Sequence, residues 1–193
     1  AGDAERALDL RLGLVERLER DREFDAALDA LERILEARPS NIALMSRKAN
    51  LLRAMGRIGE AIPVYLEIVD LFVKSDELAN AAGIYQTIID LAPEEPEHRG
   101  RQLEIYLKLG PEPVIVEKAL QAAAWRTERG QTAEGLRLLE RALEKVPHSC
   151  ELLLKSGGLY EQSGRRGEAA ERFLEAGRLH ARSAQPAEAQ EAF

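Results

Sequence analysis

Apolar residues recur every three or four positions along most of this chain, and polar residues fill the positions between them. In one representative segment the apolar residues are Phe24, Ala27, Leu28, Leu31, Ile34 and Leu35. This spacing places them along one side of a helix that is polar on its other side. The pattern therefore predicts amphipathic helices, each buried along a single stripe.

Glycine and proline interrupt the helical pattern at a fixed interval. Glycines stand at 2, 56, 110 and 164, and prolines at 39, 93 and 147, so each residue type repeats every 54 positions. Gly accepts the left-handed backbone at a helix end, and Pro cannot continue a helix. The expected helices are 3–20, 23–37, 41–54, 57–74, 77–91, 96–108, 112–129, 132–145, 149–162 and 165–182, followed by the start of an eleventh.

A six-residue phrase returns after two of these intervals. GRIGEA at 56–61 reappears as GRRGEA at 164–169, whereas GPEPVI stands between them at 110–115. Three helices per interval is an odd number, and successive helices of a two-layered array alternate between layers. Positions 54 apart are therefore expected on opposite layers, and positions 108 apart on the same layer.

Three segments of the chain resemble the tetratricopeptide repeat (TPR) family, whose motif has two antiparallel helices, small residues where they pack closely and a late Pro. Segment 116–149 matches at Ala122, Ala123, Gly130, Leu139, Ala142 and Pro147. Segment 8–41 matches at Ala27, Leu31, Ile34 and Pro39, and segment 62–95 at Ala81, Tyr85, Ile88 and Pro93. Overlapping motifs account for the unusual three-helix, 54-residue arrangement, because helix 57–74 also fits the preceding motif through Ala61, Tyr65 and Ile68.

The resemblance implies an all-α fold, a right-handed α-solenoid of stacked antiparallel helices. We expect one repeat domain over 1–193, with units 8–61, 62–115 and 116–169 and a partial unit 170–193. The last unit stops before its second helix is complete, so we expect the chain to be a fragment of a longer array. Unpaired solenoid ends are also expected to self-associate, because repeats contact only their neighbours.

Composition narrows the environment and the class of partner. The net charge is -7, which disfavours a general nucleic-acid surface, since such binding relies on Lys and Arg. Apolar runs are too short to span a membrane. The single cysteine, Cys150, excludes an internal disulfide and fits the reducing cytoplasm. Arg far outnumbers Lys and Ala is abundant, a usage associated with GC-rich bacterial genomes.

Candidate catalytic and metal-binding residues do not form a recognisable pattern. His98, His148 and His180 are far apart, without a second ligand at zinc spacing. The chain has no phosphate-binding Gly-rich loop and no nucleophile-elbow serine. Carboxylates such as those in EEPE at 94–97 fit solvated helix faces. We therefore expect no enzyme activity, metal or cofactor.

The resemblance also suggests where a partner would bind. TPR proteins commonly hold peptides on a concave surface lined by first helices, and one subclass clamps a terminal carboxylate with Lys, Asn and Arg. Helix residues 46–53, SRKANLLR, offer Arg47, Asn50 and Arg53 along one face. The matching helix offers Lys155 but has Gly158 where the clamp needs Asn. A groove of mixed charge is therefore expected instead of a complete carboxylate clamp.

A second group of candidate binding residues is Gln121 with Trp125, the only tryptophan. Trp is enriched among binding hot spots, so Trp125 is a candidate anchor for a partner. The alternative is that the neighbouring alanines make room for the ring in the core. Both interpretations remain open from the sequence.

These observations predict a scaffold that binds another protein or peptide in the solenoid groove. The alternative is a regulatory domain of a larger bacterial protein that responds to a small ligand or peptide. A deep enclosed pocket lined by polar groups would favour that alternative, whereas an open groove of mixed charge would favour the scaffold. RNA binding is disfavoured by the acidic charge and the lack of regular base-reading positions.

Overall fold

Ten α-helices make up the fold over residues 2–191, the part of the chain whose backbone the computed structural model describes; side chains are described for residues 6–182. The contacts between residues divide the chain into two units, 1–93 and 94–193. The first unit contains α1 (Gly2–Arg20), α2 (Phe24–Ala37), α3 (Ile42–Ala54), α4 (Ile58–Lys74) and α5 (Leu78–Leu91). The second contains α6 (Pro96–Leu109), α7 (Glu112–Glu128), α8 (Thr132–Lys145), α9 (Cys150–Gln162) and α10 (Arg166–Glu191).

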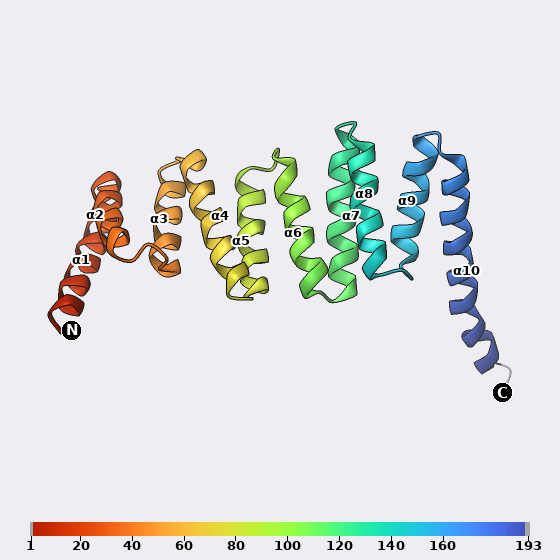
Figure 1. The fold of residues 1–193 in the computed structure, drawn as a ribbon, viewed down its shortest axis with the longest axis horizontal. Coiled ribbons are helices and arrows are strands. Elements are labelled where there is room, and N and C mark those ends of the chain that lie inside the picture. The colour runs from red at the N-terminus through yellow and green to blue at the C-terminus, as the bar shows by residue number, and fades with distance from the viewer. Residues whose placement is uncertain (1, 192–193) are drawn as a thin grey trace. The chain divides into compact units, whose positions relative to one another are not determined.

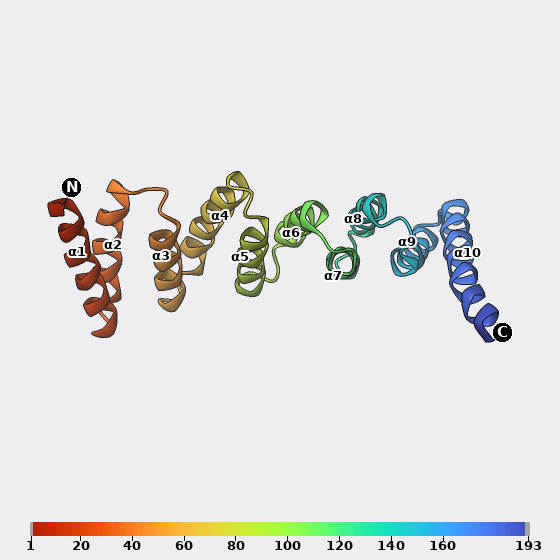
Figure 2. The same ribbon diagram turned by 90° about the horizontal axis from the view of Figure 1, so that it is seen from below.

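Within each unit, successive helices pack side by side and reverse direction, as Figures 1 and 2 show. In the second unit α6 also contacts α8, and α7 also contacts α9. Helices two apart therefore lie in the same layer there, as in a two-layered helical array. The expected all-α fold of stacked antiparallel helices is confirmed.

The 54-residue interval reappears in the helix boundaries. Helices α2, α5 and α8 each have 14 residues and begin 54 positions apart. Helices α4 and α7 have 17 residues each and keep the same offset. The predicted helices agree with the structure to within one residue at nearly every boundary. Glycine and proline positions were therefore sufficient to locate the helix ends.

Left-handed residues explain both the 54-residue and the 108-residue spacing. Arg22, Asp76 and Gly130 follow equivalent helices, with φ of 62°, 59° and 75°. Gly56 and Gly164, 108 apart, have φ of 74° and 73°. The intermediate Gly110 has φ -91° and ψ 137°, because the following residue is Pro111 and a residue before proline favours extended backbone. The phrase GR-x-GEA therefore contains the turn that ends one helix, at its Gly-Arg, and the first residues of the next helix.

Helix starts show the same alternation. Asn41 Oδ1 accepts a hydrogen bond of 3.0 Å from the amide of Leu44 at the start of α3. Ser149 Oγ accepts one of 3.3 Å from the amide of Leu152 at the start of α9. Such side-chain caps satisfy amides that lack an intrahelical partner. Helix α6 begins instead with Pro96, which needs no amide partner at that position.

The cores are built from the residues that the repeat pattern singled out. Buried residues of the first unit include Ala27, Leu31, Ile34, Ala61, Tyr65, Ile68, Ala81, Tyr85 and Ile88. In the second unit they include Ala122, Ala123, Leu139 and Ala142. Gly135 takes the place of Ala27 and Ala81 in α8, where an added Cβ would lie 3.0 Å from the Ala123 carbonyl oxygen. Small residues therefore stand where neighbouring helices approach most closely.

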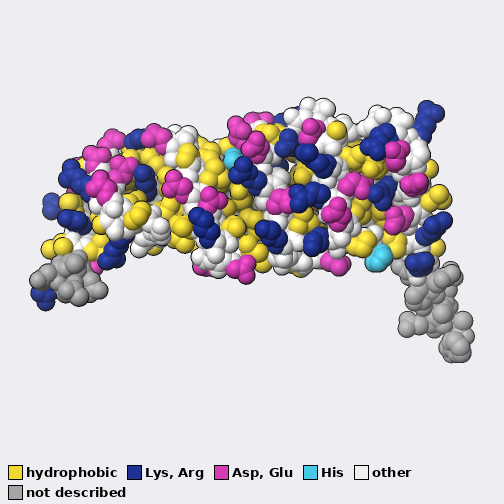
Figure 3. Space-filling model, viewed as in Figure 1, with side chains coloured by type: hydrophobic (Ala, Val, Ile, Leu, Met, Phe, Trp, Pro, Cys, Tyr) yellow, Lys and Arg dark blue, Asp and Glu magenta, His cyan; other side chains and the backbone are white. Residues whose placement is uncertain are grey.

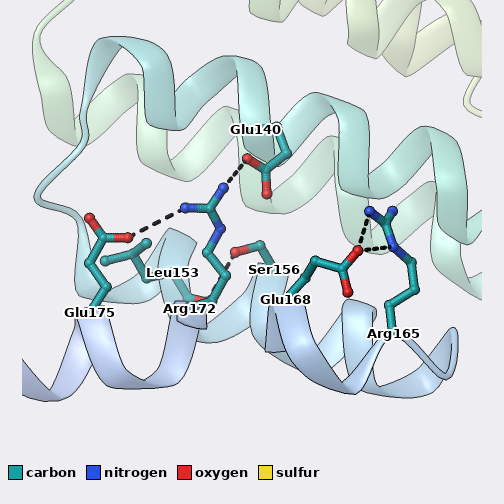
Figure 4. Close-up of polar contacts among 7 residues, drawn as sticks. All are labelled: Glu140, Leu153, Ser156, Arg165, Glu168, Arg172 and Glu175. Carbon is teal, nitrogen blue, oxygen red and sulfur yellow. Dashed lines mark hydrogen bonds and ion pairs between the residues drawn. The ribbon is translucent and has the colours of Figure 1, made fainter. Parts of the chain in front are cut away.

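One ion pair joins the last helix of the second unit to α8, and two others lie within the first turns of α10 or at its start (Figure 4). The Arg172 guanidinium on α10 donates a hydrogen bond of 2.5 Å to Glu140 on α8. Arg172 also pairs with Glu175 at 3.4 Å. At the start of α10, Arg165 pairs with Glu168 at 2.8 Å. A backbone hydrogen bond at Glu168, and then the hydrogen bond from Arg165, hold the pKa of Glu168 below its ordinary value.

One predicted boundary was wrong. A helix end was expected after residue 182, followed by an eleventh helix, but α10 continues to Glu191. Positions 22, 76 and 130 are left-handed, whereas the equivalent position is Ala184. Ala strongly prefers the right-handed helix and resists the left-handed turn. Phe193, which aligns with Tyr85 in the predicted partial unit, lies outside the described residues.

Candidate functional site

A groove in the first unit contains two of the predicted site residues. It encloses about 450 Å³ and is hereafter called the α3 groove. Its lining residues are Glu19, Phe24, Ala43, Ser46, Arg47, Asn50, Leu51 and Ala54. Most of them come from one face of α3, and Glu19 comes from the end of α1. The helical spacing noted in the sequence therefore does bring Arg47 and Asn50 to one surface.

Arg47 is already engaged by carboxylates of its own chain. Its Nε and Nη2 donate hydrogen bonds of 2.9 Å each to the two oxygens of Glu19, and Nη1 lies 3.6 Å from Glu16. The hydrogen bonds that Arg47 donates to Glu19 are the main cause of its raised pKa. Such paired, charge-assisted bonds are geometrically specific. A carboxylate of a partner would have to compete with Glu19 for this guanidinium.

The other two residues of the predicted cluster differ from each other. Asn50 Oδ1 accepts a hydrogen bond of 2.8 Å from the hydroxyl of Tyr65, whose side chain is buried and whose pKa burial raises. Arg53 is exposed on the same helix but is not part of the groove lining. The three residues therefore do not form one free cluster of donors.

A larger groove lies in the second unit and is hereafter called the α7–α9 groove. It encloses about 660 Å³. Its lining residues are Glu112, Pro113, Val116, Glu117, Leu120, Gln121, Val146, His148, Ser149, Cys150 and Glu151. The first two turns and the middle of α7 form one wall, and the end of α8 and the start of α9 form the other. The α7–α9 groove therefore has an apolar floor and an acidic rim.

Gln121 is the one predicted site residue in this groove. Its amide nitrogen donates a hydrogen bond of 2.9 Å to Glu117, and its oxygen accepts one of 3.4 Å from Lys118. Cys150 also lines the groove, and its thiol lies 3.9 Å from the Ala176 carbonyl oxygen on α10. Cys150 thus packs at the start of α9.

Trp125 lies one turn beyond Gln121 on α7 and stacks with two arginines. The Arg129 guanidinium is 3.8 Å from the ring centroid, and that of Arg99 on α6 is 5.5 Å away. Arg129 is also ion-paired with Glu94. Cation–π contacts of this kind stabilise the side chains involved. The ring is half-buried among residues of its own unit, and its use as an anchor for a partner stays a prediction.

Lys155 is exposed on α9 but does not line the α7–α9 groove. It occupies the place of Arg47, 108 residues later. The counterpart of Glu19 is Thr127, whose hydroxyl donates a hydrogen bond of 2.8 Å to the Ala123 carbonyl. The position on α7 that is equivalent to Glu19 therefore carries no carboxylate that could pair with Lys155.

Sequence reasoning missed most of the α7–α9 groove. Its floor residues Val116 and Leu120 are one turn apart, and acidic Glu112 and Glu117 adjoin them on α7. This stripe was visible as helical spacing on a single segment. The opposing wall was not, because the position of Glu151 across the groove depends on how α9 packs against α7.

The described part of the chain contains neither a metal-binding cluster nor a membrane-spanning helix. Among its side chains, no group of three His, Cys, Asp or Glu residues is placed to hold a metal ion. Across residues 2–191, no helix is both long enough and apolar enough to cross a bilayer. Burial lowers the pKa of His98, which favours its neutral form. On the face displayed in Figure 3, Lys and Arg side chains alternate with Asp and Glu, so its charge is mixed.

Comparisons with known proteins gave one family match and several similar solved structures. Residues 12–75 match the model described as tetratricopeptide repeat. Similar solved structures include a crystal structure of MamA protein (18% identity, 92% of this chain and 93% of that one, TM-score 0.46). Others are the TPR-like repeats of a putative kinesin light chain from Podosopora anserina (18%, 92% and 96%, 0.40) and a tetratricopeptide repeat protein from Parabacteroides merdae ATCC 43184 (18%, 86% and 77%, 0.32). No curated protein matches the chain in sequence.

Proposed function

Because residues 12–75 of this chain match the tetratricopeptide repeat model, we propose that the protein is a non-enzymatic scaffold that binds a partner protein or peptide in its grooves. Tetratricopeptide repeats generally mediate protein–protein interaction, and their scaffolds are generally not enzymes. The matched segment runs from α1 to the end of α4 and includes the α3 groove.

The observation that carries this proposal is the α7–α9 groove, which exposes apolar side chains on an otherwise charged surface. Val116 and Leu120 are only partly buried, and both pack against the core of the second unit. Apolar grooves rimmed by polar residues are typical of protein-binding sites. The first unit contributes the α3 groove, so each unit offers a groove of its own.

The shape of these grooves supports a scaffold over a ligand-responsive regulatory domain. Both grooves are open to solvent, and their linings combine apolar side chains with charges of both signs or with acids. A small ligand is usually held in a concave pocket that buries most of its surface. We infer a cytoplasmic location in a bacterium, in keeping with the single cysteine and the Arg-rich composition.

The scaffold proposal is tested by affinity capture with the full chain as bait, followed by binding measurements on the recovered partner. Replacements in the α3 groove region, Arg47→Glu and Arg53→Glu, and in the α7–α9 groove, Glu117→Lys, should show which surface binds. Arg137→Glu on the exposed side of α8 is the charge-matched control. A partner whose affinity is the same for all variants would exclude both grooves.

Self-association is a separate part of the proposal. Helix α10 exposes Leu174 (61%) and part of Phe173 (39%), whose ring also contacts α9, beside Ala170, Gly177 and Ala181. Exposed apolar surface of this kind favours pairing with another apolar surface. Light scattering over a concentration series should show dimers that Leu174→Glu disrupts. A strict monomer at high concentration would rule this out.

A further inference from the structure

The floor of the α7–α9 groove is a fixed apolar surface. Val146 is 5% exposed, and Val116 and Leu120 pack against the same core as Val146. Side chains held in this way need little reordering when a partner binds. An apolar side chain entering the groove would gain free energy in proportion to the apolar area that it removes from water. The floor therefore suits an apolar segment.

The rim of the groove is acidic. Glu112 and Glu117 stand on α7 and Glu151 stands on α9, and all three are exposed. Glu117 interacts with Lys118 at 3.4 Å and with Gln121 at 2.9 Å, so one lysine offsets part of the negative charge. A partner with positive charges beside its apolar residues would complement this rim.

The repeat itself shows that the fold does not require acids at all these places. The residues that precede Glu112 and Glu117 by 54 positions are Ile58 and Pro63, although Glu151 is preceded by a Glu. Glu112 and Glu151 lie in the first turns of their helices, where an acid is favourable for the helix dipole. Glu117 lies beyond the first turn, so helix stabilisation does not account for it.

We propose that the α7–α9 groove binds a partner segment in which two or more apolar residues are flanked by Lys or Arg. This inference rests on the proposed scaffold function and specifies the chemistry of the partner at one of its two grooves. The apolar residues would lie on Val116, Leu120 and Val146, and the flanking cations would face the acidic rim. Salt should weaken the complex, because exposed charges are screened by ions.

The test is a selection from a random peptide library displayed on phage, with the immobilised full chain as target. Enriched peptides are made synthetically and their binding is measured by calorimetry at two salt concentrations. The enriched sequences should combine apolar residues with flanking Lys or Arg, and their affinity should fall as salt rises. Replacing the apolar residues of the peptide by Ser should abolish binding without any change to the protein.

Protein variants locate the binding surface. The triple change Glu112→Gln, Glu117→Gln and Glu151→Gln should weaken the selected peptides about tenfold, since each exposed charge pair contributes modestly. The matched control is Glu128→Gln, Glu144→Gln and Glu161→Gln, which removes three exposed acids outside the groove and should leave the affinity unchanged. Circular dichroism and melting curves check that both triple variants fold.

Three outcomes would overturn the inference. The first is enrichment of acidic peptides, and the second is a selection without enriched binders. The third is a set of peptides that the triple variant binds normally but Arg47→Glu does not, which would assign binding to the α3 groove. That third outcome leaves the scaffold function standing, whereas failure of that function shows separately in the capture experiment.

Discussion

Helices α2–α4 and α8–α10 are two copies of one arrangement, yet different side chains join their helices. The starts of the two sets lie 108 residues apart. In the first, the buried Tyr65 of α4 donates a hydrogen bond of 2.8 Å to Asn50 on α3. In the second, Phe173 replaces the tyrosine, Gly158 replaces the asparagine, and the ring lies directly against Gly157. Close packing has therefore replaced a polar contact.

A second difference concerns the carboxylate on the helix before. Glu32 on α2 pairs with Lys48 on α3 at 2.7 Å. The equivalent Glu140 pairs instead with Arg172 on α10, because the counterpart of Lys48 is the buried Ser156, which donates its hydroxyl to the Leu153 carbonyl (Figure 4). The acidic residue is kept, and its cation comes from a different helix.

The comparison shows which parts of the repeat are fixed by backbone geometry. Gly56 and Gly164 end equivalent helices in the left-handed conformation, and the capping residues of α3 and α9 occupy equivalent positions. The side-chain contacts between helices, by contrast, differ between the two copies, and residues that touch each other are replaced together, as Tyr65 and Asn50 are by Phe173 and Gly158. The same backbone arrangement therefore presents two different basic residues. Arg47 on α3 is neutralised by Glu19, whereas the position equivalent to Glu19 offers Lys155 on α9 no carboxylate.

The largest effect is expected where the second copy packs most closely. Gly157→Ala would place a Cβ 2.7 Å from the Phe173 ring, so the ring or the helix must move. We expect the free energy of unfolding to fall by about 1 to 3 kcal/mol in urea titrations. The neighbouring Gly158→Ala is the matched control, since nothing lies within 4 Å of its added Cβ and alanine favours a helix.

Removing the Phe173 ring distinguishes a clash with that ring from a general effect of alanine on the stability of α9. If the close contact is responsible, Phe173→Ala should cancel much of the additional cost of Gly157→Ala in the double variant. Equal stability of Gly157→Ala and Gly158→Ala would contradict the description of α9 and α10 as the more closely packed pair.

The sequence predicted the backbone of this fold far better than its contacts. Helix ends follow from local signals such as Gly56 and Pro96, and the buried positions follow from helical spacing. The end expected after residue 182 failed because Ala184 lacks the turn-forming character of its counterparts. The Arg47–Glu19 pair and the wall of the α7–α9 groove depend on packing between helices, which a single segment does not reveal.

The next effect tests the polar contact of the first copy. Tyr65→Phe removes the hydrogen bond to Asn50 and should lower the free energy of unfolding by about 1 kcal/mol. The reverse change, Phe173→Tyr, should be close to neutral, because the ring is 39% exposed and its new hydroxyl can reach water. Comparable losses from both variants would mean that ring packing, and not the hydrogen bond, distinguishes the two copies.

A smaller effect is expected for the basic residues on α3 and α9. Arg47→Met breaks two hydrogen bonds to Glu19, and the partly exposed pair should contribute about 0.5 to 1 kcal/mol. Lys155→Met should change stability by less than about 0.5 kcal/mol, as surface substitutions usually do. A double-mutant cycle of Arg47→Met with Glu19→Gln measures the coupling directly. Absence of coupling would show that Arg47 is as free as Lys155.

The smallest expected effect is a pH dependence of the stability that Tyr65 contributes. Burial raises the pKa of Tyr65 above its ordinary value, so the folded protein holds the phenolic proton more tightly than the unfolded chain. The stability linked to this proton is complete below the unfolded pKa of about 10 and is lost as pH rises toward the folded pKa. Phe173 cannot titrate, so the equivalent position of the second copy adds no such dependence. The difference in unfolding free energy between the wild type and Tyr65→Phe should therefore shrink between pH 9 and pH 11 in parallel urea titrations. A constant difference would show that Tyr65 ionises in the folded protein as it does in the unfolded chain.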